Sequence, residues 1–214
     1  MKLPRIYPIL DFSSFAVKPE PLGETLRFAE ELLAGGATII QYRDKSGETA
    51  RMLACARELR RITQGKATLI INDRADICLA AQADGVHLGQ DDLSPTAARK
   101  ILFEEGKKRS RPLIVGFSTH NLEQVAQADT MPIDYVAVGP VFSTSSKANP
   151  DPVIGLEGVR QARAATQKPL VAIGGITRKN CLQAREAGAD AVAVIADLLE
   201  SPVKALEEFI RVLG

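Results

Sequence analysis

Two cations and an amide alternate along one stretch of the chain. Gln41, Arg43 and Lys45 are separated by single residues, so an extended strand would place all three side chains on one side. Positive groups are costly to remove from water unless an anion meets them, and the spacing therefore favours a phosphate or diphosphate ligand. The alternative is that either cation pairs internally, with Asp44 or Asp73.

Carboxylates follow two consecutive apolar runs. One β-branched run ends in Asn72 and Asp73, and the next is followed by Asp91 and Asp92. Mg²⁺ typically takes one or two protein carboxylates together with waters and substrate phosphate oxygens. Asp73 and Asp92 therefore suit Mg²⁺, with Mn²⁺ as a second choice. Three alternatives stay open: Asp73 caps the following helix, Asp91 is the ligand, or no metal binds.

A second anion site is expected near the end of the chain. Gly174-Gly175 and a short helical turn over 197–199 each follow an apolar run, and barrels often bind phosphate with backbone N–H groups after their last two strands. The long polar loop 140–152 carries hydroxyls followed by Lys147, which suits a lid over a phosphorylated ligand. A mobile loop without function is the alternative.

Short apolar segments and longer helical patterns alternate from end to end. The expected strands are 6–10, 38–43, 68–71, 85–88, 113–117, 135–139, 170–173 and 191–195. The expected helices are 22–33, 49–64, 75–81, one beginning at 95, 122–128, 156–165, 181–187 and one beginning at 202. On the second strand, Ile40 and Tyr42 should face the helices.

This alternation predicts an α/β fold, a closed (β/α)8 TIM barrel whose strand ends open on one face. A doubly wound open sheet is disfavoured, because no Gly-x-Gly-x-x-Gly follows the first strand and eight repeats exceed its usual number. With 214 residues, 45% of them hydrophobic, the chain can bury one large core, and we expect a single domain over 1–214.

Composition limits which classes of partner and which metal the protein is expected to bind. A net charge of +1 provides no overall field for nucleic acid or an anionic membrane. No apolar run approaches membrane-spanning length, and the N-terminus lacks a signal-peptide core, so a cytoplasmic protein is expected. Cys55, Cys78 and Cys181 are widely spaced and read as buried thiols. His87 is interpreted as a packed strand residue rather than a zinc ligand, since the only other histidine is His120.

Six motifs, taken together, resemble those of the thiamine phosphate synthase family and span nearly the whole chain. They are Gln41-Tyr42-Arg43-Asp44-Lys45, Ile71-Asn72-Asp73-Arg74, Val86-His87-Leu88-Gly89-Gln90-Asp91-Asp92, Gly116-Phe117-Ser118-Thr119-His120, Gly139-Pro140-Val141-Phe142 and Ile173-Gly174-Gly175-Ile176. The resemblance implies a Mg²⁺-dependent transferase. The family joins 4-amino-2-methyl-5-pyrimidinylmethyl diphosphate to 4-methyl-5-(2-phosphoethyl)thiazole, or its carboxylated form, and releases thiamine phosphate and diphosphate.

The resemblance also implies roles for individual residues. The pyrimidine diphosphate would be held by Gln41, Arg43, Lys45 and Asn72. The metal would be held by Asp73 and Asp92, and the leaving diphosphate would be contacted by Ser118 and Lys147. The thiazole phosphate would be held by Thr144, Ser146, Gly175, Ile195 and Ala196.

The chemistry implied by the resemblance needs no protein nucleophile. Departure of diphosphate leaves a cation stabilised by the ring's amino group, and the thiazole nitrogen attacks that carbon. Arg43, Lys45, Ser118 and Lys147 would then act catalytically by neutralising charge on the leaving group. The partners would be small molecules, and a homo-oligomer is left open.

The chain departs from the family pattern at two places. Ala196 stands where serine is common, which removes a hydroxyl from the thiazole phosphate site, and the lid 143–147 differs from the usual Pro-Thr-x-Thr-Lys. Three rival functions are weighed: a thiazole tautomerase with His120 as proton shuttle, a non-catalytic sensor of thiamine precursors, and a sugar phosphate isomerase barrel. The residues for metal and diphosphate argue against the tautomerase, and the paired aspartates argue against the isomerase. A sensor would bind the same ligands without releasing diphosphate. The number of agreeing motifs favours the synthase.

Overall fold

The strands pair in chain order and close on themselves. In the computed structural model, which describes residues 3–108, 112–144 and 151–214, eight parallel strands form a closed barrel in which the last strand pairs with the first. The strands are β1 (Ile6–Asp11), β2 (Ile39–Arg43), β3 (Thr68–Asn72), β4 (Gly85–Leu88), β5 (Ile114–Thr119), β6 (Tyr135–Val138), β7 (Leu170–Ile173) and β8 (Ala191–Val194). The predicted (β/α)8 barrel is confirmed.

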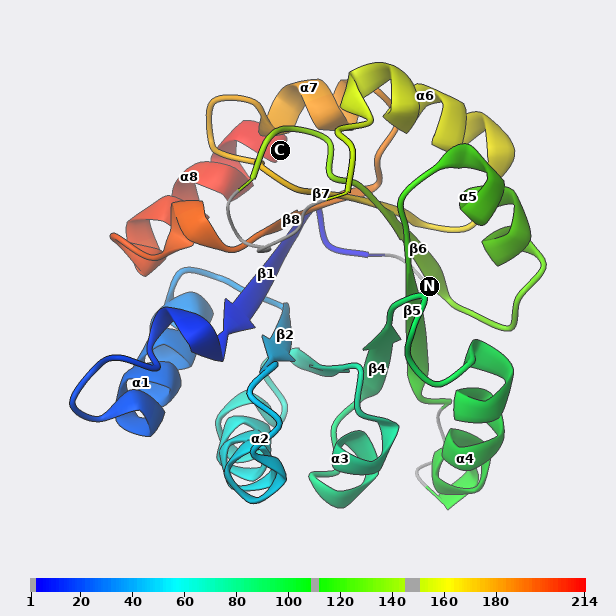
Figure 1. Ribbon diagram of the computed structural model, residues 1–214. Coiled ribbons are helices and arrows are strands. Elements are labelled where there is room, and N and C mark those ends of the chain that lie inside the picture. The colour runs from blue at the N-terminus through cyan, green and yellow to red at the C-terminus, as the bar shows by residue number, and fades with distance from the viewer. Residues whose placement is uncertain (1–2, 109–111, 145–150) are drawn as a thin grey trace.

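The helices form a ring outside the strands (Figure 1). They are α1 (Pro21–Ala34), α2 (Thr49–Thr63), α3 (Ala75–Ala80), α4 (Pro95–Lys108), α5 (Leu122–Asp129), α6 (Gly155–Ala165), α7 (Cys181–Glu186) and α8 (Pro202–Leu213). Short 3-10 turns, η1 (Phe12–Ser14) and η2 (Ala196–Leu198), follow β1 and β8.

Local signals explain where these helices begin and end. The Ser94 hydroxyl accepts a hydrogen bond from the Ala97 N–H and so caps α4, and α1 ends at Gly35 before Gly36 takes a φ of 97°. The expected bounds hold to within two residues. The largest difference is at the end of β5, which continues through Ser118 because Thr119 still pairs in register with Val138.

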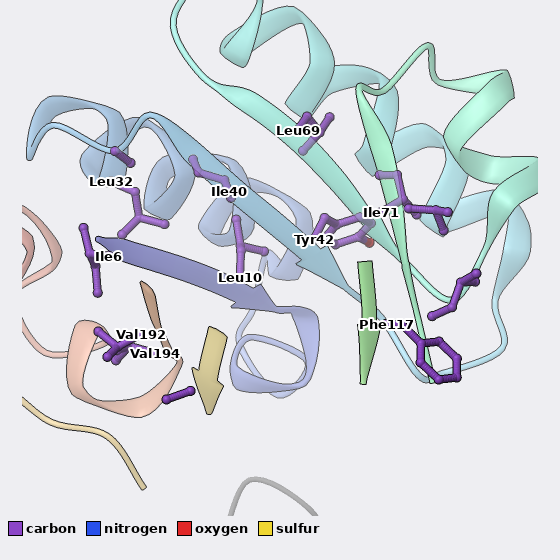
Figure 2. Packing of buried hydrophobic residues seen from close by; sticks show 14 of the residues in the cluster. Ile6, Leu10, Leu32, Ile40, Tyr42, Leu69, Ile71, Phe117, Val192 and Val194 are labelled. Atoms are coloured by element: carbon purple, nitrogen blue, oxygen red, sulfur yellow. The ribbon is translucent and has the colours of Figure 1, made fainter. Parts of the chain in front are cut away.

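Two apolar layers hold the barrel together. Outward-facing strand residues, such as Leu10, Ile40 and Tyr42, pack against helix residues, such as Leu32 of α1 (Figure 2). A smaller cluster, which includes Ile39, fills the barrel interior. The predicted outward direction of Ile40 and Tyr42 is confirmed. Gln41, between them, therefore faces the interior, where its side chain bonds to Tyr7.

The cysteines are structural, as predicted. Cys55, Cys78 and Cys181 are buried, and burial raises the pKa of the Cys55 thiol to about 11, which keeps that thiol protonated and unreactive. Within the residues described, no helix is long and apolar enough to cross a bilayer.

Candidate active site

Arg43 is held at the mouth of the barrel by an aspartate from the neighbouring strand. β1 ends at Asp11 and β2 at Arg43, and the two residues pair in register, so their side chains meet in an ion pair. Asp11 is 4% exposed and also accepts hydrogen bonds from the Ser13 N–H (3.0 Å) and hydroxyl (2.8 Å). Asp44, one of the two internal partners considered from the sequence, pairs with Arg51 at 3.5 Å. Arg43 therefore has a partner, Asp11, that the sequence did not suggest.

Lys45 reaches Asp73 from the next strand over. Its Nζ lies 2.5 Å from Oδ2 of Asp73, so the internal ion pair considered as an alternative is present. The lysine side chain is 53% exposed, whereas that of Asp73 is 15% exposed. A pair with one exposed, flexible partner contributes little to stability. The ammonium group can therefore turn toward an arriving anion at small cost.

Asp73 sits in an unusual backbone conformation directly after β3. Its φ is 64°, and its N–H donates to the carbonyl of His87 at 2.7 Å on the adjacent strand. The following helix, α3, has Arg74 at its N-cap position and no side-chain cap. The helix-cap alternative for Asp73 is therefore wrong, and its carboxylate is directed to other partners.

Asp73 and Asp92 come together at this point. Burial first, and then the hydrogen bond and charge of Asp92, raise the pKa of Asp73 to about 6, although Lys45 opposes the shift. Asp92 is partly buried and accepts a hydrogen bond from the Gly89 N–H at 2.7 Å, whereas Asp91 is exposed. Of the two candidates after β4, Asp92 is the one beside Asp73.

This acidic pair fits a hard divalent cation. Two carboxylates that contact one another repel when ionised, and a shared cation relieves that repulsion. Among the described residues there is no group of three or more His, Cys, Asp or Glu side chains that could hold a metal. A metal bound by Asp73 and Asp92 would therefore complete its shell with water and ligand oxygens, which is the habit of Mg²⁺ rather than Zn²⁺.

Asn72 carries a buried donor that has no acceptor among the described residues. The residue is 6% exposed, and its Nδ2 makes no hydrogen bond to any part of the chain that the structure describes. A buried amide N–H without a partner costs about 1–3 kcal/mol. A ligand acceptor at this position would remove that cost.

Gln41 and Ser118 are each hydrogen-bonded to a residue that the sequence analysis did not assign to the site. The Nε2 of Gln41 donates to the Tyr7 hydroxyl at 3.1 Å, and Ser118 Oγ lies 2.8 Å from Nε2 of His87. The Nδ1 of His87 lies 2.9 Å from the Tyr135 hydroxyl. His87 is thus a packed strand residue, as predicted, and both of its ring nitrogens are engaged.

The first residues of the loop after β6 pack against the Gly174-Gly175 turn. Both glycines have positive φ, 99° and 62°, and the Phe142 N–H donates to the Gly174 carbonyl at 3.0 Å. A Cβ on Gly175 would lie 2.3 Å from the Ser143 carbonyl oxygen. Only glycine therefore permits this close approach, which joins the expected lid to the expected phosphate pocket.

An arginine that the sequence analysis did not assign to the site connects the segment after β7 to η2 and α8. Arg178 bonds Asp197 of η2 through Nε at 3.0 Å and through its backbone N–H at 2.8 Å, and its guanidinium also bonds Glu208 of α8 at 2.7 Å. The expected turn at 197–199 is present one residue earlier. Ile195 and Ala196 lie at its start, partly buried and exposed respectively.

For the remaining predicted site residues, the structure gives less detail. Thr144 is partly buried at the end of the described part of the loop, and Ser146 and Lys147 lie outside the described residues. His120, the candidate proton shuttle of the tautomerase alternative, is partly buried, with Nδ1 2.8 Å from the Gly139 carbonyl and 3.4 Å from the Asp151 carboxylate.

Comparison with known proteins identifies a family that matches this chain. A family model described as thiamine monophosphate synthase matches residues 14–198. The chain is 52% identical to the thiamine-phosphate synthase of Koribacter versatilis over 214 residues, which cover 100% of this chain and 97% of that protein. It is 44% identical to the thiamine-phosphate synthase of Methanospirillum hungatei, with 83% of each chain covered.

A solved structure agrees with the sequence matches. The thiamine phosphate pyrophosphorylase from Pyrococcus furiosus superposes with a TM-score of 0.82 at 33% identity, over 98% of this chain and 95% of that one. The resemblance inferred from the six motifs is therefore confirmed. By the family-model match, its relatives and its fold, the chain belongs to the thiamine monophosphate synthase family of transferases.

Proposed function

We propose that this protein joins 4-amino-2-methyl-5-pyrimidinylmethyl diphosphate to 4-methyl-5-(2-phosphoethyl)thiazole, or its carboxylated form, as a Mg²⁺-dependent thiamine-phosphate synthase. The observation that carries the proposal is the contact between Asp73 and Asp92 beside Lys45, at the same barrel mouth as Arg43. This combination suits a diphosphate and a divalent cation bound together. The family membership supports the identity of the two heterocycles.

The diphosphate would lie between the cations of β2 and the end of β5. Arg43 is pre-positioned by Asp11, so little side-chain freedom is lost when its guanidinium meets a phosphate oxygen. Lys45 would exchange its contact with Asp73 for the anion. Ser118 would donate its hydroxyl to the same group, and Lys147, outside the described residues, is assigned here through the family motif alone.

Asp73 and Asp92 would hold the Mg²⁺, with Mn²⁺ as an alternative, and this ion would supply neutralisation of charge on the leaving group. The protein's own residues then bind and orient. The unpartnered Nδ2 of Asn72 offers a donor to the pyrimidine diphosphate, and the Gln41 amide, fixed by Tyr7, is assigned to the same substrate.

The reaction breaks the bond between the pyrimidinylmethyl carbon and the diphosphate oxygen. The bonding electron pair leaves with diphosphate, and the positive charge on the carbon is shared with the ring's amino group. The thiazole nitrogen then forms the new bond with its lone pair. With the carboxylated thiazole, the carboxylate leaves as carbon dioxide and a proton takes its place. Because neither step needs a protein nucleophile, the site has to supply only charge stabilisation and positioning.

The thiazole phosphate would bind where the loop after β6, the Gly174-Gly175 turn and η2 meet. Backbone donors there have to compensate for Ala196, which offers no hydroxyl. Thr144 and Ser146 are assigned to this ligand by the family motifs, together with Gly175 and Ile195.

Loss of Arg178 should weaken this second site selectively. Arg178→Leu removes the side-chain bonds from the β7 end to Asp197 of η2 and to Glu208 of α8, so we expect the KM for the thiazole phosphate to rise about tenfold. The KM for the pyrimidine diphosphate should change little. Steady-state kinetics with each substrate varied in turn measure both values. Lys179→Leu, at the exposed neighbouring residue, is the matched control, and an equal effect from it would contradict the positioning role of Arg178.

One assay separates the proposed synthase from its rivals. Protein, both phosphorylated heterocycles and Mg²⁺ are combined, and thiamine phosphate and free diphosphate are quantified with each component omitted in turn. The synthase should give the two products in equal amounts only when all components are present. Binding without diphosphate release would indicate a sensor, and conversion of the thiazole alone would indicate a tautomerase. Either outcome would contradict the proposal.

A further inference from the structure

A continuous line of hydrogen bonds crosses the floor of the site. The Gln41 Nε2 donates to the Tyr7 hydroxyl at 3.1 Å, and the Tyr7 and Tyr135 hydroxyls are 2.7 Å apart. Tyr135 lies 2.9 Å from Nδ1 of His87, and Nε2 of His87 lies 2.8 Å from Ser118 Oγ. We call these five residues the buried relay. It links a residue assigned to the pyrimidine with one assigned to the leaving group.

The middle of the buried relay is sealed from solvent. Tyr7 and Tyr135 are almost fully buried, and burial raises the pKa of Tyr7 to about 12 and holds the pKa of Tyr135 well above its usual range. Both phenols are therefore neutral and carry one proton each. The rings also pack, Tyr7 edge-on to Tyr135 at 5.8 Å and His87 stacked on Tyr135 at 5.5 Å.

Counting protons from the Gln41 end gives the relay a direction. Tyr7 already accepts from the amide nitrogen of Gln41, so its own proton is available for Tyr135. If Tyr7 donates that proton, Tyr135 accepts there and its own proton is left for Nδ1 of His87. A neutral imidazole that accepts at Nδ1 carries its proton on Nε2, and it therefore donates to Ser118.

Counting from the other end gives the same direction. If Ser118 faces the leaving diphosphate, as the proposed function requires, its single proton must go to the anion, because phosphate oxygens at neutral pH only accept. Its oxygen must then accept from His87. In a neutral imidazole, that again requires the Nε2–H form of His87 and a donated proton from Tyr135.

We propose that the buried relay is polarised in one direction, so that His87 is locked as its Nε2–H tautomer and Ser118 is committed to donate to the leaving diphosphate. The same polarity turns the amide oxygen of Gln41 away from Tyr7, as an acceptor for the amino group of the pyrimidine. Tyr7, Tyr135 and His87 are positioning residues, which act through Gln41 and Ser118. This inference rests on the proposed function.

A glycine makes room for the relay. His87, Gly116 and Tyr135 lie at one level on three adjacent strands, because His87 pairs with Gly116 and Gly116 pairs with Tyr135. A Cβ on Gly116 would lie 2.1 Å from Cζ of Tyr135 and 2.4 Å from its hydroxyl oxygen. Any side chain at position 116 would therefore displace the phenol that donates to His87.

The tautomer of His87 tests the inference without any substrate. The chain has two histidines, so a ¹⁵N-histidine-labelled sample gives two ring systems, and the variant His120→Asn assigns them. At mildly alkaline pH, the ¹⁵N shifts of His87 should show a protonated Nε2 and a lone pair on Nδ1. A protonated Nδ1, or two tautomers in exchange, would overturn the proposal.

Two phenylalanine variants test what the relay does. Tyr135→Phe should release the His87 tautomer and lower kcat about tenfold. Tyr7→Phe removes one hydroxyl of the buried relay but leaves the Tyr135 hydroxyl that donates to His87. It should therefore leave the His87 tautomer unchanged. Its main effect should be a higher KM for the pyrimidine diphosphate, because the Gln41 amide loses its partner. Equal kinetic losses in both variants, with the tautomer unchanged in both, would reduce the relay to a structural role and contradict the inference.

Gly116→Ala is a third test of the role of Tyr135, because it alters no polar group. It should reproduce the tautomer release and the kcat loss of Tyr135→Phe, provided that circular dichroism shows the barrel intact. An intact Gly116→Ala protein with the wild-type tautomer would contradict the role given to Tyr135.

Failure of the proposed function is distinguishable from failure of the relay. If the wild-type protein showed the Nε2–H tautomer but formed no thiamine phosphate, the inferred direction of the hydrogen bonds would stand. Only the proposed function, and with it the role of Ser118 toward diphosphate, would fail.

Discussion

Replacement of Asp73 with asparagine should lower kcat/KM by about 100-fold or more in the presence of Mg²⁺. The carboxylate is half of the acidic pair with Asp92, and an amide cannot supply the charge that a divalent cation requires. Asparagine is the appropriate substitute because Asp73 has a φ of 64°, a conformation that asparagine tolerates better than alanine. The loss of activity can then be attributed to the missing charge rather than to backbone strain.

Stability should respond to this substitution in a way that identifies the metal site. Burial and Asp92 raise the pKa of Asp73 to about 6, so the ionised carboxylate is disfavoured in the folded protein and its replacement should not lower the metal-free Tm above that pH. With diphosphate present, Mg²⁺ should raise the Tm of the wild type but not that of Asp73→Asn. Asp91→Asn, at the exposed neighbour of Asp92, is the control and should behave as wild type. A Mg²⁺-dependent rise in Asp73→Asn would contradict the metal assignment.

Replacement of Arg43 with methionine should damage both stability and activity. Asp11 is buried, and removal of its partner leaves an uncompensated charge, which typically costs about 3 kcal/mol of unfolding free energy. The same change removes a cation assigned to the diphosphate. We therefore expect a fall of about 100-fold in kcat/KM, measured below the Tm of the variant.

A double variant separates the two effects. Asp11→Asn combined with Arg43→Met removes the unpaired charge, so most of the lost unfolding free energy should return while activity stays low. Urea denaturation gives the stability of each variant, and the coupled assay for diphosphate gives the activity. Recovery of activity in the double variant would show that Arg43 serves only to neutralise Asp11, and it would remove Arg43 from the diphosphate site.

Much of the fold followed from local patterns in the sequence. Apolar runs alternating with helical periodicity predicted all eight strands, because strands buried on both faces leave that signal in any parallel barrel. The end of β5 was placed too early because Ser118 and Thr119 are polar, and only the pairing of Thr119 with Val138 shows that the strand continues. Residue type alone does not reveal such a pairing.

The sequence suggested candidate residues where they end a strand, and it did not suggest residues that act from a distance. The expected proximity of Asp73 and Asp92 is observed, because neighbouring strand ends meet at one edge. The partner of Arg43 was missed, since the register that places Asp11 beside it is a property of the closed sheet. Tyr7 and Tyr135 look like ordinary core aromatics in the sequence. Their hydroxyls gain meaning only when the barrel brings them within 2.7 Å of each other.

A crystal structure of this protein with Mg²⁺ and diphosphate would test the proposed site most directly. We expect one metal ion bound by Asp73 and Asp92, and a diphosphate that contacts that ion, Arg43 and Lys45, with Lys45 moved away from Asp73. A metal ion held by Asp91, or a diphosphate bound away from Arg43 and Lys45, would show that this barrel mouth does not bind the departing diphosphate.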